Sequence, residues 1–421
     1  MKNWAGNLIF TPQNIVAPKS IGEIQKVIQE KKNIRVRGSA HSWTDLIATD
    51  DTFMHLDNLQ GVISIDEKHK RIRAWGGTKL SLLGEKAFEA GLALPNQGDI
   101  NKQSVAGALS TGTHGTGITL QSMANQVRDL TIVTSSGEAL SIGKEHPYYE
   151  ASRVSFGSLG IIADLNLDFV DAYKLKVESF SENMDDCLVN LHSRLKENRH
   201  LEMFYFPQGD WSIVKMMNQT DQDITPKNVA HKFNDVVIEN WLYEGLNLLA
   251  NSTKSYALLD KVMRRFVSHQ TKVDWSHRAF PADRTVKFME MEYNLALEKF
   301  EEVFSEIKAC IKKNKFQTLF PIEIRFVKAD SIWLSPAFER DSVYFAVHTY
   351  ISEDWKPYFE SIQEIFKRHG GRPHWGKWHS LEYGDFEKIY PKWHNFLEIR
   401  KTLDPEGLFL NAHLNKIFRI F

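Results

Sequence analysis

Hydrophobic and polar positions in the first part of the chain follow two different periods. Residues 20–31 carry apolar side chains at three- and four-residue intervals behind Ser20, which predicts an amphipathic helix with a serine cap. Alternating patterns predict short strands at 34–37, 62–66, 71–75 and 130–134. A second helical pattern covers residues 80–90. Because strands and helices do not alternate regularly, this part is predicted to be α+β and not a series of βαβ units.

The composition narrows the class of protein. The chain has 421 residues, enough for two domains, and its 52 Lys plus Arg against 53 Asp plus Glu give a formal net charge of −1. No nucleic-acid partner is expected, because such binding rests on a basic surplus. Only Cys187 and Cys310 are present, and no apolar run is long enough to cross a membrane. These features predict a cytoplasmic protein with no membrane partner.

Two loops rich in small residues are candidates for phosphate binding. In the first, Gly38, Ser39 and Ala40 let backbone N–H groups converge on an anion, and His41 follows them. On its own this loop is equally well explained as a strand-to-loop turn. The second loop, residues 104–117, is dense in Gly, Ser and Thr, and two such loops indicate a dinucleotide. The G-x-G-x-x-G fingerprint of nicotinamide-dinucleotide domains is absent.

Taken together, the motifs of this chain resemble those of the sugar-lactone and alditol oxidases of the vanillyl-alcohol-oxidase superfamily. The resemblance rests on the order and spacing of short motifs along nearly the whole chain, at residues 3–7, 38–42, 94–96, 111–115, 157–160, 323–325, 333–336, 372–377 and 403–411. It implies a two-domain α+β flavoprotein. The expected FAD-binding domain is 1–172 with a C-terminal return over 376–421, and the expected cap over the substrate, built on an antiparallel sheet, is 173–375.

The resemblance also implies how FAD is held. His41 matches the histidine that bonds covalently to the flavin, and no second covalent link is expected, since neither cysteine lies in a matching motif. The cofactor-binding positions it implies are Val36, Arg37, Gly38, Ser39, Ala40, His41, Ser42, Gly98, Asp99, Ser104, Gly107, Ala108, Ser110, Thr111, Gly112, His114, Ile162 and His374. No metal is expected, because the interval between His374 and His379 suits no known zinc spacing.

Candidate catalytic residues lie in the second half of the chain. Strict alternation over 321–326 places Glu323 and Arg325 on one face of a strand, roughly 6.5 to 7 Å apart, within reach of one small substrate. A surface ion pair is the alternative. The resemblance makes these two residues the substrate-binding and activating pair, and makes Lys377 the cation that polarises the hydroxyl being oxidised.

Three departures bear on the substrate. Asp99 stands near the place of a serine that contacts the polyol in alditol oxidases, Ala346 stands in the place of a histidine, and His348 in that of a threonine. The expected substrate is therefore an aldono-1,4-lactone bound by Asp99, Glu323, Arg325, His348 and Lys377. Gly98 matches the position where glycine lets oxygen approach the flavin, so an oxidase using O₂ is expected. The alternatives are an alditol oxidase and a flavin-binding sensor without turnover.

Overall fold

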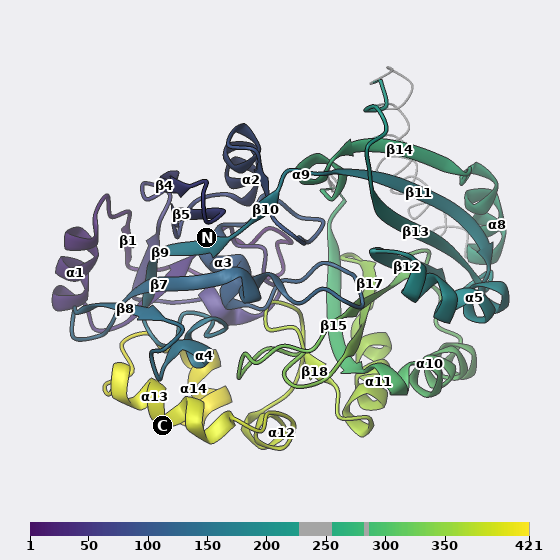
Figure 1. The fold of residues 1–421 in the computed structure, drawn as a ribbon. Helices are drawn as coiled ribbons and strands as arrows, with labels where there is room; N and C mark the ends of the chain where they lie inside the picture. Colours follow the sequence, from purple (N-terminus) through teal and green to yellow (C-terminus); the bar gives the residue numbers. More distant parts are fainter. Residues whose placement is uncertain (227–254, 282–285, 421) are drawn as a thin grey trace.

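The computed structural model describes residues 1–226, 255–281 and 286–420. Its strands fall into two parts (Figure 1). In the first, β1 (Asn14–Val16), β3 (Thr52–His55) and β2 (Ile34–Arg37) form a parallel sheet. Beside it lies a five-stranded antiparallel sheet, in the order β4 (Val62–Asp66), β5 (Arg71–Trp75), β9 (Ile161–Asp168), β7 (Val127–Val133) and β8 (Ala139–Gly143). The strands predicted at 34–37, 62–66 and 71–75 are confirmed as β2, β4 and β5. The strand predicted at 130–134 is β7, which begins three residues before the predicted start.

The helices of this part include both predicted ones. Ser20 caps α1 (Ile21–Glu30), since its hydroxyl accepts a hydrogen bond from the amide of Glu23. The other helices of the first part are α2 (Leu80–Glu89), α3 (Val105–Ser110) and α4 (Tyr149–Ser152), with short 3-10 turns at Asp45–Ile47 and Met123–Gln126. A small ladder of β6 (Leu92–Ala93) with β10 (Val170–Asp171) leads to the second part.

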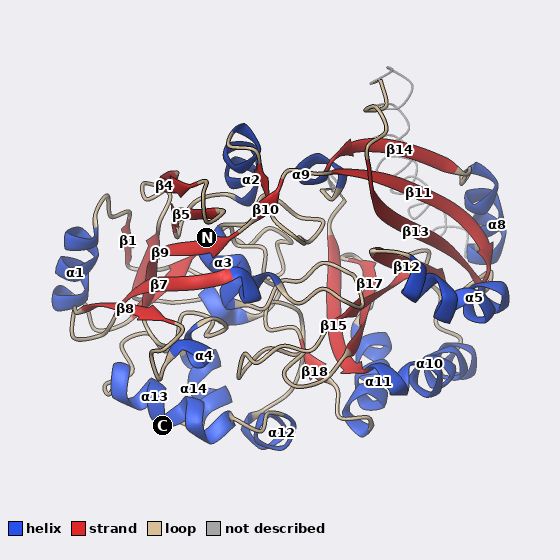
Figure 2. Cartoon of the chain, in the orientation of Figure 1, coloured by secondary structure: helices blue, strands red, loops and turns tan. Residues whose placement is uncertain are grey.

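The second part is built on an eight-stranded sheet whose neighbours are all antiparallel (Figure 2). In spatial order its strands are β14 (Gln270–Trp275), β11 (Lys174–Asn183), β13 (Trp211–Thr220), β12 (His200–Phe206), β16 (Ile322–Val327), β17 (Ser342–Tyr350), β15 (Phe288–Ala296) and β18 (Arg372–Pro373). The described helices of this part are α5 (Met184–Glu197), α8 (Tyr256–Phe266), α9 (Ser276–Ala279), α10 (Phe300–Asn314) and α11 (Lys356–Arg368), with a 3-10 turn at Leu297–Lys299. Residues 227–254 and 282–285 of the expected cap lie outside the described residues.

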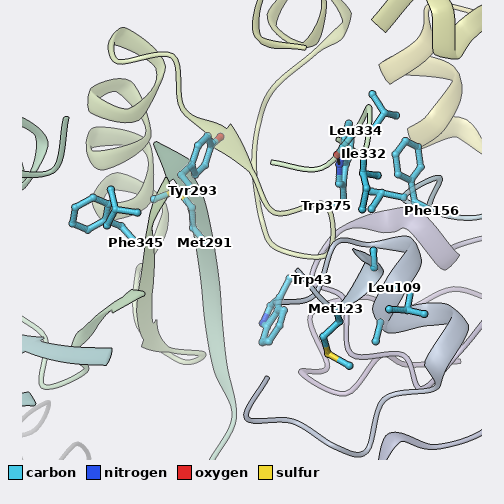
Figure 3. Packing of buried hydrophobic residues seen from close by; sticks show 14 of the residues in the cluster. Trp43, Leu109, Met123, Phe156, Met291, Tyr293, Ile332, Leu334, Phe345 and Trp375 are labelled. Carbon is cyan, nitrogen blue, oxygen red and sulfur yellow. Dashed lines mark hydrogen bonds between the residues drawn. The ribbon is translucent and has the colours of Figure 1, made fainter. Parts of the chain in front are cut away.

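The two faces of this sheet differ in chemistry. On one face Phe345 stacks against Phe300 of α10 and Phe366 of α11, and Phe326 also meets Phe300. Figure 3 shows Met291, Tyr293 and Phe345 gathered on this side. The alternate positions of the same strands are polar, and this second face is the one that carries the charged residues described below. Because successive side chains of a strand point to opposite faces of the sheet, the same strands contribute to the helix-covered core on one face and to the charged surface on the other.

The last segment of the chain returns to the first part. Helices α12 (Tyr383–Ile389), α13 (Trp393–Leu403) and α14 (Ala412–Phe418) lie beneath it in Figure 1. The amide of Ile34 donates to the carbonyl of Leu408, and the Asn411 side chain donates to the carbonyl of Asp45. Trp375, just before this segment, stacks on Phe156 of the first part (Figure 3). Among the described residues, no helix has the length and apolar character needed to span a bilayer.

Candidate active site

A hollow of about 830 Å³, a volume that includes the open solvent at its mouth, lies on the first part between the end of β2 and the start of α3. The predicted cofactor residues that line it are Val36, Arg37, Gly38, Ser39, Ala40, His41, Ser42, Ser104, Gly107, Ser110, Thr111 and Ile162. Sequence reasoning missed other lining residues, among them Gly76, Gly77, Gln103, Gly157 and Gly160. The two candidate phosphate loops therefore face one common space, although they lie about seventy positions apart in the sequence.

Close backbone packing explains the small residues at this hollow. A Cβ at Gly38 would lie 2.2 Å from the hydroxyl oxygen of Ser104, so only glycine lets the loop after β2 approach the start of α3. The Ser104 hydroxyl is already engaged there, since it accepts a hydrogen bond from the amide of Gly107. At Gly76 a Cβ would lie 2.3 Å from the carbonyl oxygen of Ile162. The hollow thus exposes backbone rather than side chains, as a site for a phosphate-bearing group requires.

His41 lies at the edge of this hollow. Its ring stacks on Trp4, with the ring centres 5.6 Å apart. Burial, together with the positive charges of Lys377 and Lys287, lowers the pKa of His41 from 6.5 to about 4. The imidazole is therefore neutral at neutral pH, and one ring nitrogen keeps the lone pair that a covalent bond to a cofactor requires.

The remaining predicted cofactor residues do not line the hollow. His114 and His374 lie near the large sheet, with ring centres 6.1 Å apart, and a Cβ at Gly98 would lie 3.1 Å from the carbonyl oxygen of His114. Asp99 faces Arg325 and belongs to the charged cluster below. Ala108 is buried within α3, and Gly112 packs against Pro336. Neither Ala108 nor Gly112 lines the hollow or belongs to the charged cluster around Arg325.

Buried polar atoms beside Gly115 fit a bound ring system. Both side-chain polar atoms of Asn96 and the amide nitrogen of Gln97 are buried with no hydrogen-bond partner among the described residues. Buried polar groups are nearly always hydrogen-bonded in a complete structure. A flavin carries the donors and acceptors that these atoms lack, and the glycine-lined hollow suits a pyrophosphate. The residues present therefore fit FAD.

The polar face of the large sheet brings the predicted pair together with Asp99. Arg325 forms ion pairs with Glu323 beside it on β16 and, at 2.7 Å, with Asp99. A third carboxylate, Glu202 of β12, lies 3.2 Å from Nε of Arg325. Burial by itself lowers the pKa of Arg325, but the three carboxylates more than compensate and hold it above its ordinary value. The guanidinium is therefore a permanent cation in a buried site, and the pair is not a surface ion pair.

Lys377 and His348 form a second cluster around Glu290 of β15. The ammonium nitrogen of Lys377 lies 2.5 Å from Glu290 and 4.3 Å from the centre of the Trp43 ring. His348, opposite Glu290 on β17, places Nε2 3.5 Å from the same carboxylate. Glu292, two residues along β15, pairs at 3.0 Å with His114, whose ring stacks on Tyr344 of β17.

Sequence reasoning missed four charged residues of this face, Glu202, Lys215, Glu290 and Glu292. A signal for two of them is present, because Met289-Glu290-Met291-Glu292 alternates strictly between apolar and acidic residues. All four lie in strands of the large sheet. The ion pairs that they form, with Arg325, Lys377, His114 or one another, depend on strand order, which alternation does not give.

The sequence matches two family profiles. Residues 165–417 match the profile described as D-arabinono-1,4-lactone oxidase, and residues 12–143 match an FAD binding domain. The chain is 34% identical to an L-gulono-1,4-lactone dehydrogenase of Mycobacterium tuberculosis and 32% identical to an L-gulonolactone oxidase of Mus musculus, in each case over 99% of this chain and 98% of the relative. An alditol oxidase of a Streptomyces species is 25% identical over the same shares.

The fold matches that of solved cholesterol oxidases. Cholesterol oxidase from Brevibacterium sterolicum superposes with a TM-score of 0.81 at 15% identity, covering 99% of this chain and 96% of that one. At this identity the likeness concerns the fold alone. It confirms the predicted two-part α+β architecture of the vanillyl-alcohol-oxidase type, with an FAD-binding part and an antiparallel sheet.

Proposed function

The chain belongs to the D-arabinono-1,4-lactone oxidase family of FAD-dependent oxidoreductases, and from this we propose that it oxidises an aldono-1,4-lactone with O₂ as the electron acceptor. The substrate is L-gulono-, L-galactono- or D-arabinono-1,4-lactone, and the second product is H₂O₂. The observation that supports this most strongly is that two fixed cations, Arg325 and Lys377, are each paired with a glutamate of the same polar sheet face, Glu323 and Glu290. A non-catalytic flavin sensor has no need of both.

The cofactor in this proposal is FAD, held along the hollow by the loops 36–42 and 104–111 and linked covalently to His41. When bound, it supplies the acceptor for the hydride that leaves the substrate carbon. The neutral imidazole of His41 and its stacking on Trp4 support the covalent link. Residues 1–172 and 376–421 form the FAD-binding domain, and 173–375 the cap over the substrate.

The chemical work of the protein side chains is electrostatic. Arg325 places a permanent positive charge next to the oxygen of the carbon being oxidised, and Lys377 polarises the hydroxyl so that its proton leaves more readily. Glu323 and Asp99 fix the direction of Arg325 and accept hydrogen bonds from substrate hydroxyls. His348 and Asp99 replace the polyol-binding residues of alditol oxidases, which favours a lactone ring over an open-chain alditol.

A panel of lactones and alditols, scored by H₂O₂ release under air, tests this function. We expect kcat/KM with gulono- or arabinono-1,4-lactone to exceed that with xylitol or sorbitol at least ~10-fold, about 1.4 kcal/mol of differential transition-state binding. A preference for xylitol would make the chain an alditol oxidase. Reduction of a dye by lactone without H₂O₂ formation would make it a dehydrogenase, like its mycobacterial relative in name.

A further inference from the structure

A row of alternating charges crosses three neighbouring strands of the large sheet. Lys215 of β13 stands directly opposite Glu202 of β12, and Glu202 stands directly opposite Arg325 of β16. Nζ of Lys215 lies 2.7 Å from Oε1 of Glu202, and the other oxygen of Glu202 lies 3.2 Å from Nε of Arg325. Glu202 is thus held between two cations, one of which belongs to the proposed substrate site.

Glu202 and Asp99 hold different nitrogens of Arg325. Glu202 approaches Nε, whereas Asp99 and Glu323 approach Nη2. Contacts at two nitrogens fix the plane and direction of a guanidinium, which one contact leaves free to rotate. Glu202 is 1% exposed, so water does not substitute for either of its partners.

The charge balance explains why Lys215 is present. Asp99, Glu202 and Glu323 bring three carboxyl groups to Arg325, and their ligand oxygens lie within 4.8 Å of one another. Arg325 alone does not balance them. Lys215 supplies the second positive charge, and its side chain is only 18% exposed. A buried carboxylate that loses its partner takes up a proton rather than stay charged.

We propose that Glu202 and Lys215 are positioning residues, which act on the substrate through Arg325 by fixing the direction of its guanidinium. The inference rests on the proposed function in one respect only, that Arg325 binds the substrate, and it holds equally for a lactone or an alditol. It assigns a role to two strands, β12 and β13, that carry none of the residues expected to touch the substrate.

Burial and the charge of Asp99 raise the pKa of Glu202, while Lys215 and Arg325 oppose the shift. Glu323 adds a further negative charge that raises this pKa. His200, two positions along β12, turns its Nδ1 to the carbonyl of Thr116. Removing the charge of Lys215 therefore raises the pKa of Glu202 further. A protonated Glu202 no longer holds Arg325 as a carboxylate does.

The test compares Lys215→Met, Glu202→Gln and the double variant as holoenzymes, assayed with the best substrate of the panel. Lys215→Met should lose kcat/KM at low pH and regain it as the pH rises and Glu202 ionises, giving an acidic limb at higher pH than in the wild type. Glu202→Gln should lower kcat/KM about 10-fold, the effect of one charge-assisted hydrogen bond, at every pH. The double variant should lack the shifted acidic limb of Lys215→Met, because Glu202 is no longer there to titrate.

Substrate affinity gives a second readout that does not depend on turnover. Binding of the best substrate to the anaerobically reduced holoenzyme, which cannot accept a hydride, is measured by equilibrium dialysis and should weaken about 10-fold in Glu202→Gln. Unchanged affinity in this variant overturns the inference, even if Lys215→Met fails to fold.

Lys176→Met is the matched control. Lys176 pairs with Glu178 at 2.9 Å on β11 of the same sheet, but it is offset from Ser179, the partner of Lys215, by an odd number of residues and so points to the opposite face. Its pH profile should match the wild type. An acidic limb in Lys176→Met equal to that of Lys215→Met would show a general effect of charge on the sheet and would overturn the inference. If the wild type does not turn over any lactone, only the proposed function is contradicted. The variants are then assayed with the best alditol of the panel, so the inference is still tested.

Discussion

The ammonium group of Lys377 is fixed by the carboxylate of Glu290, with 2.5 Å between Nζ and Oε2. Burial alone favours the neutral form of Glu290, but Lys377 and His348 outweigh it and lower the pKa of this glutamate from 4.5 to about 2. Glu290 is therefore a carboxylate at neutral pH. The Trp43 ring, 4.3 Å from Nζ, limits the directions that the lysine can take. A charge fixed before the substrate arrives costs no reorganisation during the reaction.

Loss of either cation should slow the reduction of bound FAD by substrate. In Lys377→Met and in Arg325→Leu we expect ~10²- to 10³-fold slower reduction, the usual effect of removing one charged donor from a preorganised site. Anaerobic stopped-flow absorbance measures this rate directly. Lys308→Met is the control, since Lys308 also pairs with a carboxylate, Asp210, and lies over an aromatic ring, Tyr205, but belongs to α10 on the other face of the sheet. Wild-type rates in both site variants would show that the catalytic site lies elsewhere.

His41→Ala should convert tightly held FAD into releasable FAD. The wild-type protein, precipitated with acid, should keep its yellow colour in the pellet, because a covalent bond survives unfolding. The variant should release the colour into the supernatant. His69→Ala, at an exposed histidine paired with Asp66, should behave as the wild type. A colourless wild-type pellet is the result that excludes the covalent link.

The lactone preference should depend on two neighbouring positions of β17. Ala346 stands opposite Glu323 on one side and Glu292 on the other, so a histidine there would lie between two carboxylates. In Ala346→His/His348→Thr, which introduces the alditol-oxidase residues at these two positions, the ratio of kcat/KM for lactone over xylitol should fall at least ~10-fold, about 1.4 kcal/mol. Steady-state assays with both substrates measure the ratio. If it is unchanged, these residues do not select the substrate.

Gly98→Ala should slow the reoxidation of the flavin by O₂ more than its reduction by substrate. The added Cβ would lie 3.1 Å from the carbonyl oxygen of His114 and 3.4 Å from a methyl group of Thr113, so it fits after a small shift. One methyl group on the oxygen path should slow reoxidation by O₂ while anaerobic reduction by substrate stays near the wild-type rate. Reoxidation is followed by mixing the reduced enzyme with oxygenated buffer. Equal oxygen reactivity in both proteins would remove the role assigned to Gly98.

The buried histidine His379 should make the fold sensitive to acid. Burial, with His413 and Lys416 nearby, lowers the pKa of His379 from 6.5 to about 3, and neither ring nitrogen meets a hydrogen-bond partner among the described residues. Below pH 6.5 the unfolded chain takes up a proton that the folded state refuses until about pH 3. The free energy of unfolding therefore falls in this window, by up to ~1.4 kcal/mol per pH unit for one group.

Replacing His379 by leucine should reduce this acid sensitivity. Urea unfolding at pH 7 and pH 5 should show a smaller loss of stability in His379→Leu than in the wild type, with little change at pH 7, since the neutral imidazole makes no hydrogen bond there. His69→Leu serves as the exposed control. Equal losses in the wild type and His379→Leu would contradict the expectation.

Local features of this protein are readable from its sequence. The Ser20 cap, the strand at 34–37 followed by a small-residue loop, and the placement of Glu323 and Arg325 on one face all depend on residues within a few positions of each other. Capping, backbone freedom and strand alternation act over such short distances, so a pattern suffices to predict them. The shared motifs likewise indicated the family.

Only the tertiary structure decided which distant charges meet. Asp99 reaches Arg325 across 226 positions of sequence, and Glu202 and Lys215 join them because β13, β12 and β16 are neighbours in the sheet. Glu290 meets Lys377 only because the loop after β18 passes beside β15. Period-two alternation assigns a side chain to a face, but strand order and register come from the packing of the whole sheet against its helices. The sequence by itself therefore determined which residues could be catalytic, and long-range strand pairing determined the partners that hold them.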